Sequence, residues 1–295
     1  MGYLSPTTTD ELLNPLGLSA DELRVLVKQA LVEDLGQGDL TTRVTIPEGM
    51  KARGTFRSKQ NLVVAGLPVA AQVFQVLDSS LAWEPAVEDG TEVEAGTPLG
   101  TASGSAAGLL AGERVALNFL QHLSGIATFA MRLKSELAGL KAEFLDTRKT
   151  TPGLRSLQKY AVRMGGGQNH RLRLDDGILI KNNHLRLVGG ISKAVENARR
   201  NRPPEFHIEV EVTSLAELEE AIGAGADGVL LDNMTPAEVH QCVERARDRA
   251  RLEVSGGIDA GNIRAYAEAG VDYISVGALT HSAPAVDINF RIEPL

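Results

Sequence analysis

Two stretches of the sequence repeat each other, and this repeat limits the folds that the chain can adopt. Residues 221–231 (AIGAGADGVLL) and 267–276 (AEAGVDYISV) each run from the end of a helical pattern, through Gly-x-Asp, into an apolar run typical of a strand. Repeated strand–helix units favour parallel strands joined by right-handed crossovers. A repeating unit of this kind favours a barrel over an open sheet.

The strand–helix rhythm covers the second half of the chain. Helices are predicted at residues 215–222 and 236–249, between short runs that are rich in apolar residues. Alternation of this kind is typical of an α/β fold. The predicted strands are residues 142–146, 178–181, 207–212, 228–232, 252–255 and 272–276.

The first half has a different pattern. Residues 19–36 open with a Ser-x-x-Glu capping box and predict an amphipathic helix that a glycine ends. Residues 112–140 are apolar-periodic and predict one or two helices. Between them, residues 52–103 predict a compact strand-rich unit, because glycines separate short β-like runs such as 61–65 and 83–87.

The composition is that of a globular protein with room for one large barrel and a smaller domain. Hydrophobic residues make up 43% of the 295 positions and charged residues 23%. The apolar stretch at 62–77 is too short and too polar to cross a bilayer. The only cysteine, Cys242, has no disulfide partner, and residues 1–12 lack the pattern of a signal peptide. We therefore expect a cytoplasmic protein without a membrane role.

The formal net charge of -8 argues against nucleic acid as a partner, but the basic residues are unevenly spread. Between positions 148 and 181, only Asp175 and Asp176 oppose a group of eight cations. Such a segment would attract a small polyanion. The cations are Arg148, Lys149, Arg155, Lys159, Arg163, Arg171, Arg173 and Lys181.

Polar residues follow the predicted strands of the second half. In α/β barrels the chemistry is carried by residues at the carboxyl ends of the strands. Loops are polar in any case, but six polar strand ends together favour a site. These ends are Arg148 with Lys149, Lys181, Glu211, Asp232, Ser255 to Gly257, and Gly277.

The glycines after the last two strands suggest a phosphate site. Late loops of such barrels often bind phosphate through backbone amides, and glycine allows the backbone to approach an anion closely. Ser255-Gly256-Gly257 and Gly277-Ala278 fit this pattern, although tight turns would need the same residues. A phosphate monoester is the ligand that we favour here.

Glu211 and Asp232 end neighbouring predicted strands. Their carboxylates could accept hydrogen bonds from sugar hydroxyls and stabilise positive charge at an anomeric carbon, or they could hold a metal. Leu230-Leu231-Asp232-Asn233 lacks the two consecutive acids and Thr-Gly loop of type I phosphoribosyltransferases. A phosphoribosyl transfer would therefore need another scaffold.

Four other motifs give weaker indications of function. A GxGxxG spacing at residues 223–228 follows a helix and precedes a strand, the reverse of a dinucleotide-binding loop. His170 and His184 lack zinc-site spacing, and a substrate contact is the better interpretation of His170. Residues 165–167 (GGG) fit a closing loop or a plain turn. Residues 88–100 resemble half of a biotinyl or lipoyl carrier, but no lysine is available there.

Longer motifs give the chain a close resemblance to quinolinate phosphoribosyltransferases. The most specific are DTRKTTPGLR at 146–155 and GGGQNHR at 165–171, and the matches extend from residue 33 to residue 282. The other motifs are EDLGQGDLTT at 33–42, GERVALNFLQHLSGIAT at 112–128, LIKNNH at 179–184, EVEV at 209–212, LLDNM at 230–234, and VSGGI through VGALTHS at 254–282.

The resemblance implies an N-terminal α/β sandwich followed by an incomplete TIM-like α/β barrel. We place the sandwich at residues 1–112, the barrel at 113–280, and a segment at 281–295 that packs on the N-terminal domain. It further implies a homodimer with shared active sites that makes nicotinate mononucleotide from quinolinate and phosphoribosyl pyrophosphate, with decarboxylation, for NAD biosynthesis. Mg²⁺ would bind mainly through the substrate, near Glu211 and Asp232.

The resemblance also assigns roles to residues. The quinolinate carboxylates would bind five cations, Arg114, Arg148, His170, Arg171 and Lys181. The pyrophosphate would face Lys149, with Thr147 nearby, and the ribose would contact Glu211 and Asp232. The 5-phosphate would lie against Ser255, Gly256, Gly257, Gly277, Ala278 and His281. The catalytic residues among these would be Lys149, Lys181, Glu211 and Asp232.

One position departs from the family pattern. Members usually carry an acid after the lysine, as K-D/E-N-H, and this chain has Asn182 there. An asparagine still accepts a hydrogen bond, so we expect activity with altered metal or proton handling.

A paralogue acting on another aromatic acid would share the phosphoribosyl half of the site. The cations for a second carboxylate argue against that alternative.

Overall fold

The computed structural model describes residues 17–247 and 249–295, which form two compact units with interleaved sequences. The sheet unit contains described residues 17–131, 152–166 and 283–295, and the barrel unit contains 132–151 and 167–282. The expectation for residues 1–12 lies outside the described residues. The domain boundaries expected after residues 112 and 280 stay predictions.

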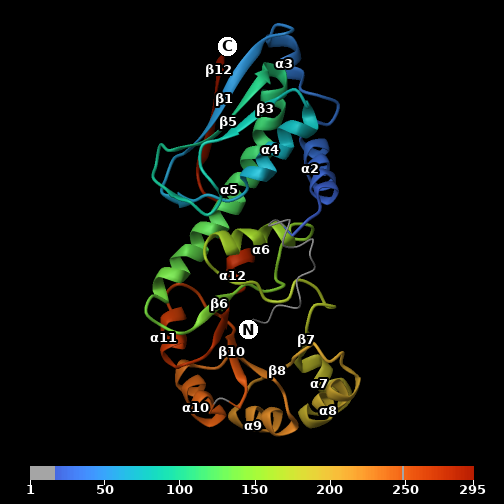
Figure 1. The fold of residues 1–295 in the computed structure, drawn as a ribbon, viewed down its shortest axis with the longest axis vertical. Coiled ribbons are helices and arrows are strands. Elements are labelled where there is room, and N and C mark those ends of the chain that lie inside the picture. Colours follow the sequence, from blue (N-terminus) through green and yellow to red (C-terminus); the bar gives the residue numbers. More distant parts are fainter. Residues whose placement is uncertain (1–16, 248) are drawn as a thin grey trace. The chain divides into compact units, whose positions relative to one another are not determined.

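The sheet unit is built on a four-stranded antiparallel sheet with the order β12-β1-β5-β3 (Figure 1). Its strands are β1 (Lys51–Ser58), β3 (Ala82–Pro85), β5 (Pro98–Ser105) and β12 (Ile288–Pro294). A separate antiparallel pair consists of β2 (Leu62–Val63) and β4 (Glu92–Val93). The predicted strand-rich character of residues 52–103 is confirmed in these strands.

Helices complete this part of the chain: α2 (Ala20–Leu35), α3 (Leu40–Thr45), α4 (Leu67–Leu77), α5 (Ala106–Glu136) and α6 (Arg155–Met164). The capping box of α2 is confirmed, because the Glu22 amide donates to Ser19 Oγ at 3.2 Å and the Ser19 amide donates to Glu22 at 2.8 Å. The predicted segment 112–140 is one helix that begins before Gly112.

Helix α4 was missed in the strand-rich segment. Its first amides, those of Gly66 and Leu67, donate to the Asp89 carboxylate at 2.7 and 3.1 Å. The Tyr160 hydroxyl on α6 donates to the same carboxylate at 2.7 Å. The side-chain cap therefore comes from a distant residue, and the local start signal is limited to Gly66 at the N-cap and Pro68 in the first turn.

Aromatic side chains fill the core of the sheet unit. Phe56 on β1 is fully buried, and its ring centroid lies 4.2 Å from that of Phe290 on β12 and 5.8 Å from that of Trp83 on β3. Gly54 makes room for this packing, because a Cβ there would lie 1.9 Å from the Phe290 ring. Burial of rings this size contributes a large share of a small core's stability.

The barrel unit contains a six-stranded parallel sheet with the order β6-β11-β10-β9-β8-β7. The strands are β6 (Glu143–Leu145), β7 (Ile178–Ile180), β8 (Ile208–Val212), β9 (Gly228–Asp232), β10 (Arg251–Ser255) and β11 (Tyr273–Ser275). All six predicted strands are confirmed to within two residues at either end. A parallel sheet of this size, with its helices, matches the predicted incomplete α/β barrel.

Helices α7 to α11 of the barrel unit lie around the outside of these strands in Figure 1, and the short helix α12 follows the last of them, β11. They are α7 (Asn182–Val188), α8 (Ile191–Asn201), α9 (Leu215–Ala224), α10 (Pro236–Ala246), α11 (Ile263–Glu268) and α12 (Ala278–His281). The predicted helices at 215–222 and 236–249 are α9 and α10. Thr235 caps α10 in a capping box with Glu238.

Alternation along the strands divides the sheet into an apolar and a polar face. Residues paired in register share a face, and residues two apart on a strand do too. One face carries Val210, Val229, Leu231, Val254 and Ile274, all buried and apolar. The other face, called here the inner face, carries Glu209, Glu211, Leu230, Asp232, Glu253, Ser255, Tyr273 and Ser275.

The Gly-x-Asp repeat has a structural cause. The Asp227 carboxylate accepts from the Ile208 amide at 2.8 Å, and the Asp227 amide donates to the Ile208 carbonyl at 2.8 Å. Asp272 does the same with Leu252, at 3.0 Å for both bonds. Each repeat therefore joins the start of one strand to the start of its neighbour, which sets the register between them.

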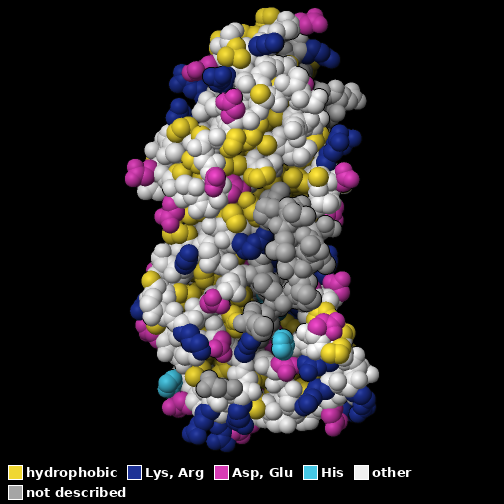
Figure 2. Space-filling view, viewed as in Figure 1, with side chains coloured by type: hydrophobic (Ala, Val, Ile, Leu, Met, Phe, Trp, Pro, Cys, Tyr) yellow, Lys and Arg dark blue, Asp and Glu magenta, His cyan; other side chains and the backbone are white. Residues whose placement is uncertain are grey.

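No helix in the described part of the chain has the length and apolar character that a bilayer crossing requires. Acidic and basic side chains are interspersed over the face drawn in Figure 2. This mixture is typical of a surface in contact with water.

A substitution at Gly125 in α5 would test how closely the segment around Pro284 packs on this helix. A Cβ at Gly125 would lie 2.2 Å from the Pro284 carbonyl oxygen. Gly125→Ala should therefore lower the free energy of unfolding by about 1–3 kcal/mol. The control is Gly223→Ala in α9, where a Cβ meets open space, and it should raise stability by about 0.5–1 kcal/mol. Urea unfolding followed by circular dichroism measures both; equal effects would contradict the packing argument.

Candidate active site

Lys181 and Glu211 form an ion pair at the carboxyl ends of β7 and β8. Ile180 pairs with Val210 in the sheet register, which puts the next residues, Lys181 and Glu211, side by side. The Lys181 Nζ atom lies 2.6 Å from Glu211 Oε2. About half of the Lys181 side chain is exposed, whereas Glu211 is nearly buried. The lysine charge is therefore neutralised on one side and open to solvent on the other.

Asp232 is held by its neighbours at the end of β9. The Ser255 hydroxyl, which is in register with Asp232 on β10, donates to Asp232 Oδ1 at 2.9 Å. The Asn233 side-chain amide donates to Oδ2 at 2.8 Å, and Asn233 adopts a left-handed backbone with φ 56°. Both oxygens of Asp232 thus accept hydrogen bonds from neighbouring side chains, which fix the orientation of the carboxylate.

Two glycine loops lie beside these strand ends. Gly256 has φ 104°, and a Cβ there would lie 2.2 Å from Asn233 Oδ1, so only glycine fits. A Cβ at Gly277 would lie 3.1 Å from the Lys149 side chain and 3.2 Å from His281 Nε2. The second loop therefore brings a lysine and a histidine to one glycine, followed by Ala278 at the start of α12.

The loop after β6 holds the first part of the basic segment. The Thr147 hydroxyl accepts from the Lys149 amide at 3.0 Å, and the Thr280 hydroxyl donates to the Lys149 carbonyl at 2.8 Å. Between them, Arg148 has a buried Nε atom without a hydrogen-bond partner among the described residues. A buried guanidinium nitrogen of this kind has an unmet need for an acceptor.

Arg148 and Arg171 lie close enough to repel each other. Burial lowers the pKa of the Arg171 guanidinium, and the positive charge of Arg148 lowers it further. Arg171 Nη1 donates to the Gly177 carbonyl at 2.7 Å, which holds the side chain in place. Each guanidinium group has fork-shaped donors that match a carboxylate.

Asp146 organises the loop that carries Arg171. Its buried carboxylate accepts from the Asn169 side chain at 2.5 Å and from the His170 amide at 2.9 Å. The Asp146 amide donates to the Gln168 carbonyl at 3.1 Å, and the Gln168 amide donates to the Phe144 carbonyl at 3.1 Å. The segment 168–170 is therefore fixed to β6 and its extension.

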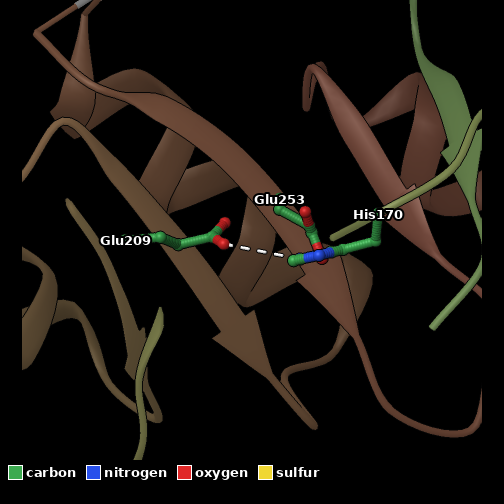
Figure 3. A group of neighbouring side chains, drawn as sticks. All are labelled: His170, Glu209 and Glu253. Carbon is green, nitrogen blue, oxygen red and sulfur yellow. Dashed lines mark ion pairs between the residues drawn. The ribbon is translucent and has the colours of Figure 1, made fainter. Parts of the chain in front are cut away.

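His170, Glu209 and Glu253 form a buried cluster on the inner face (Figure 3). His170 Nε2 lies 3.5 Å from Glu209 Oε2 and 3.7 Å from Glu253 Oε1. Burial raises the pKa of the Glu253 carboxyl to about 7, and the neighbouring Glu209 carboxylate adds to the rise. In the described part of the chain this is the only group of three side chains close enough to share a metal ion.

Comparisons with known proteins identify the family. The family model described as "Quinolinate phosphoribosyl transferase, C-terminal domain" matches residues 126–291. The model described as "Quinolinate phosphoribosyl transferase, N-terminal domain" matches residues 39–124. The chain belongs to the quinolinate phosphoribosyltransferase family.

Known members of the quinolinate phosphoribosyltransferase family match this chain over most of their length. A nicotinate-nucleotide pyrophosphorylase [carboxylating] from Mycobacterium leprae is 44% identical over 280 residues, covering 92% of this chain and 98% of the relative. A quinolinate phosphoribosyltransferase [decarboxylating] 1b from Nicotiana tabacum is 36% identical, covering 92% and 83%. The crystal structure of NadC from Streptococcus pyogenes superposes with a TM-score of 0.90 at 40% identity, covering 94% and 99%.

In this family member, the predicted site residues after the barrel strands gather at the carboxyl ends of adjacent strands. They are Thr147, Arg148, Lys149, Lys181, Glu211, Asp232, Ser255 to Gly257 and Gly277 to His281. Arg114 belongs to the sheet unit, where it is exposed on α5. Gly165 and Gly166 end α6, and the Gly166 amide donates to the Arg163 carbonyl in a plain turn.

Sequence reasoning missed the partners of His170. Glu209 was quoted only inside the EVEV motif, and Glu253 was not singled out at all. The available signal was alternation, since an acid at every second position of an otherwise apolar strand points to one face of the sheet. Two such strands that pair with the same neighbour put their acids on the same face.

Glu253 should make stability depend on pH. Its raised pKa means that the folded state binds a proton that the unfolded state releases between about pH 4.5 and 7. Stability from this group is therefore present at low pH and is lost as pH rises to about 7. Glu253→Gln cannot ionise, so its free energy of unfolding relative to wild type should be higher at pH 8 than at pH 5 by about 1 kcal/mol or more.

Urea unfolding at the two pH values measures this difference. The groups that face Glu253 are Glu209 on β8, His170, Lys181 after β7 and Ser275 on β11. The control is Glu48→Gln, at an exposed position of the sheet unit. An identical shift for both variants would show that Glu253 is not the source.

Proposed function

We propose that this chain transfers the phosphoribosyl group of phosphoribosyl pyrophosphate to quinolinate with decarboxylation, giving nicotinate mononucleotide, pyrophosphate and carbon dioxide for NAD biosynthesis. The observation that carries the proposal is the Arg148–Arg171 pair, in which two close guanidinium groups repel each other. A small dianion with two carboxylates side by side would relieve that repulsion and supply the acceptor that Arg148 Nε needs.

In the proposed complex the carboxylates of quinolinate bind to Arg148, Arg171 and Lys181, with Arg114 as a further cation. The open side of Lys181 supports this role, since Glu211 occupies only one direction around the ammonium group. Lys149 would then face the pyrophosphate. A dianion and a polyphosphate in one site require several cations. The basic segment 148–181 supplies them.

The acids at the end of β8 and β9 would contact the ribose. Glu211 and Asp232 share the inner face and could accept hydrogen bonds from sugar hydroxyls. Their negative charge is favourable when the anomeric carbon becomes cationic. The loops at Ser255 to Gly257 and at Gly277 to His281 would cradle the 5-phosphate, because glycine backbones allow close approach of an anion.

Positioning supplies most of the proposed catalysis. The pyridine nitrogen attacks the anomeric carbon as the bond to pyrophosphate breaks, through an oxocarbenium-like state. The nitrogen then bears a positive charge, which stabilises the electron pair left on the adjacent carbon when carbon dioxide departs. A proton from water ends the step on that carbon. No organic cofactor is required by this route.

Mg²⁺ is proposed to arrive with phosphoribosyl pyrophosphate. Both Asp232 oxygens already accept hydrogen bonds and Glu211 is paired with Lys181, so these acids fit a cation that brings phosphate and water oxygens as its other ligands. When bound, Mg²⁺ would neutralise charge on the pyrophosphate leaving group. Asn182 adds a neutral acceptor where relatives of the family usually carry an acid.

We also propose a cytoplasmic homodimer in which each active site combines residues of both chains. Arg114 supports the shared site, because it precedes the barrel strands and lies on an exposed part of α5. The other proposed carboxylate ligands all follow barrel strands. In a two-fold dimer such a contribution is reciprocal.

A direct assay tests the proposed function. The protein is incubated with quinolinate, phosphoribosyl pyrophosphate and Mg²⁺, and nicotinate mononucleotide and carbon dioxide are measured. Nicotinate serves as the matched control, because it lacks the second carboxylate and leaves buried cations unpaired. Product from quinolinate but not nicotinate is expected; turnover of nicotinate alone would reassign the chain to another aromatic acid.

Arg171 and Lys181 should each be needed for quinolinate binding. Arg171→Ala and Lys181→Ala are expected to weaken it by roughly 1.5–3 kcal/mol, the scale of a hydrogen bond to a charged group. Calorimetry measures the affinity. Arg173→Ala is the control, because Arg173 lies in the same loop but is exposed and paired with Asp175 at 3.2 Å. Unchanged affinity in both site variants would remove them from the carboxylate site.

Remixing of inactive dimers tests the shared site. Arg114→Ala and Lys181→Ala proteins should both be nearly inactive, but unfolding and refolding them together should restore roughly a quarter of wild-type activity. Half of the randomly paired dimers would then have one intact site. Arg148→Ala mixed with Lys181→Ala is the control, since both residues lie in one barrel unit and every site would keep a defect. No recovery in the first mixture, with mixed dimers confirmed by tags, would refute the shared site.

A further inference from the structure

Asn233 has a backbone conformation that few residues adopt, and it follows Asp232 directly. Its φ of 56° lies in the left-handed region, where asparagine is one of the few residues tolerated besides glycine. The next residues are held in place, because Tyr266 Oη donates to the Met234 carbonyl at 3.2 Å and Thr235 caps α10. The chain therefore turns sharply from β9 into α10 at Asn233, and this turn sets the direction of the Asn233 side chain.

The Asn233 side chain holds Asp232 through its nitrogen atom. Asn233 Nδ2 donates to Asp232 Oδ2 at 2.8 Å, while the Ser255 hydroxyl donates to Oδ1 at 2.9 Å. A carboxylate oxygen attracts an amide N–H and repels an amide oxygen, so Asn233 Oδ1 must face away from Asp232. The Asp232 carboxylate is thus fixed from two sides, and its remaining lone pairs are left for a sugar hydroxyl.

The other side of Asn233 lies against the Gly256 loop, which consists of Ser255, Gly256 and Gly257. A Cβ at Gly256 would lie 2.2 Å from Asn233 Oδ1 and 2.9 Å from the Asn233 amide nitrogen. The Asn233 amide also donates to the Ser255 carbonyl at 2.9 Å, which continues the pairing of β9 with β10 by one further bond. The backbone of Gly256 therefore packs directly against Asn233, and its position depends on that side chain.

The far end of the Gly256 loop is held by Asn262. Asn262 Nδ2 donates to the Gly257 carbonyl at 2.9 Å, and Asn262 Oδ1 accepts from the Asp259 amide at 2.9 Å. Among the residues that the structure describes, none accepts a hydrogen bond from the amide of Gly256 or Gly257. The loop thus combines a fixed backbone with amides that are available to an anion.

We propose that Asn233 is a positioning residue that joins the two parts of the phosphoribosyl site: it orients the Asp232 carboxylate for the ribose and fixes the Gly256 backbone for the 5-phosphate. The assignment of these two parts rests on the proposed function. Groups that are ordered in advance bind more tightly, because the ligand does not have to order them. The ribose and the phosphate then contact Asp232 and the loop amides rather than the Asn233 side chain.

Two substitutions each keep part of what Asn233 supplies. Glycine adopts the left-handed conformation without strain but has no donor for Asp232. Aspartate has the shape of asparagine and tolerates the same conformation, but it places a second negative charge where the donor was. Asn233→Gly and Asn233→Asp therefore remove the action of the carboxamide while the turn itself is kept.

Two probes test the proposal by binding alone. Ribose 5-phosphate reaches both parts of the site, whereas inorganic phosphate reaches only the Gly256 loop; nitrogen-15 NMR of the glycine amides at pH 8 without divalent metal follows both titrations. Asn233→Gly should weaken ribose 5-phosphate about tenfold or more and inorganic phosphate about threefold or more. Asn233→Asp should weaken both at least as much. Unchanged phosphate affinity in Asn233→Gly, or wild-type affinity for ribose 5-phosphate in Asn233→Asp, would overturn the proposal.

Arg247→Gly is the matched control. Arg247, at the end of α10, is the other non-glycine residue with a left-handed backbone in the described part of the chain, with φ 42°. Glycine there relieves the same kind of backbone strain at a distance from the strand ends, so both affinities should stay within about twofold of wild type. An equal loss in Arg247→Gly would attribute the effect to a general loosening of the barrel unit and contradict the role of Asn233.

A ligand-free crystal structure of Asn233→Gly separates positioning from direct contact. A positioning role predicts that the Asp232 carboxylate turns or becomes disordered and that the Gly256 backbone shifts, with the bond from Asn262 to Gly257 retained. If Asp232 and Gly256 kept their wild-type positions while ribose 5-phosphate bound more weakly, Asn233 would be a direct ligand and the proposal would be wrong.

Steady-state kinetics connect Asn233 with the proposed reaction. Asn233→Gly should raise the KM for phosphoribosyl pyrophosphate about tenfold, with the KM for quinolinate within about twofold of wild type. An equal rise in both would contradict a role confined to the phosphoribosyl half of the site. Failure of the wild-type protein to make nicotinate mononucleotide would instead contradict the proposed function, and would leave the crystallographic result on Asn233 standing.

Discussion

The inner face of the parallel sheet must accommodate charge in a place with little water, and much of the barrel unit depends on how it does so. Its strands carry Glu209, Glu211 and Glu253 among apolar neighbours. Buried carboxylates are costly unless they are paired or protonated. Glu211 is paired with Lys181, Glu253 retains a proton near neutral pH, and Glu209 lies beside His170. Two of these solutions require a particular side chain from outside the strands, Lys181 and His170, so the acids constrain where those residues lie.

The cations show the opposite situation. Arg148 and Arg171 are close together, and among the described residues Arg148 Nε has no acceptor. The acids of the inner face thus have compensating neighbours, whereas Arg148 still lacks an acceptor for its Nε atom among the described residues. A guanidinium in this state suits a site that binds an anion, beside a lysine, Lys181, that Glu211 already holds in place.

Much of this arrangement could be predicted from the sequence. Strand positions followed from apolar runs, and polar strand ends located the site because parallel strands bring their carboxyl ends together. Helix α4 was missed because its side-chain cap, Asp89, is distant in the chain and Pro68 in its first turn was not taken as a helix start. Glu209 and Glu253 were missed because their effect depends on register between strands, which a local pattern does not contain. His170 was found, but the hydrogen bond that its Nδ1 atom accepts from the Arg171 amide is visible only in the fold.

The pairing of β12 with β1 has a consequence for the making of the protein. Phe290 on β12 packs against Phe56 on β1, although every barrel strand lies between them in the chain. During synthesis from the N-terminus, the sheet that begins with β1 therefore lacks one edge and one core ring until the whole barrel has emerged from the ribosome. Long-range pairing of this kind is slow and leaves an open edge for longer. The nascent chain would be most vulnerable to aggregation at β1, and truncation a few residues short of the end should be far more damaging than its length suggests.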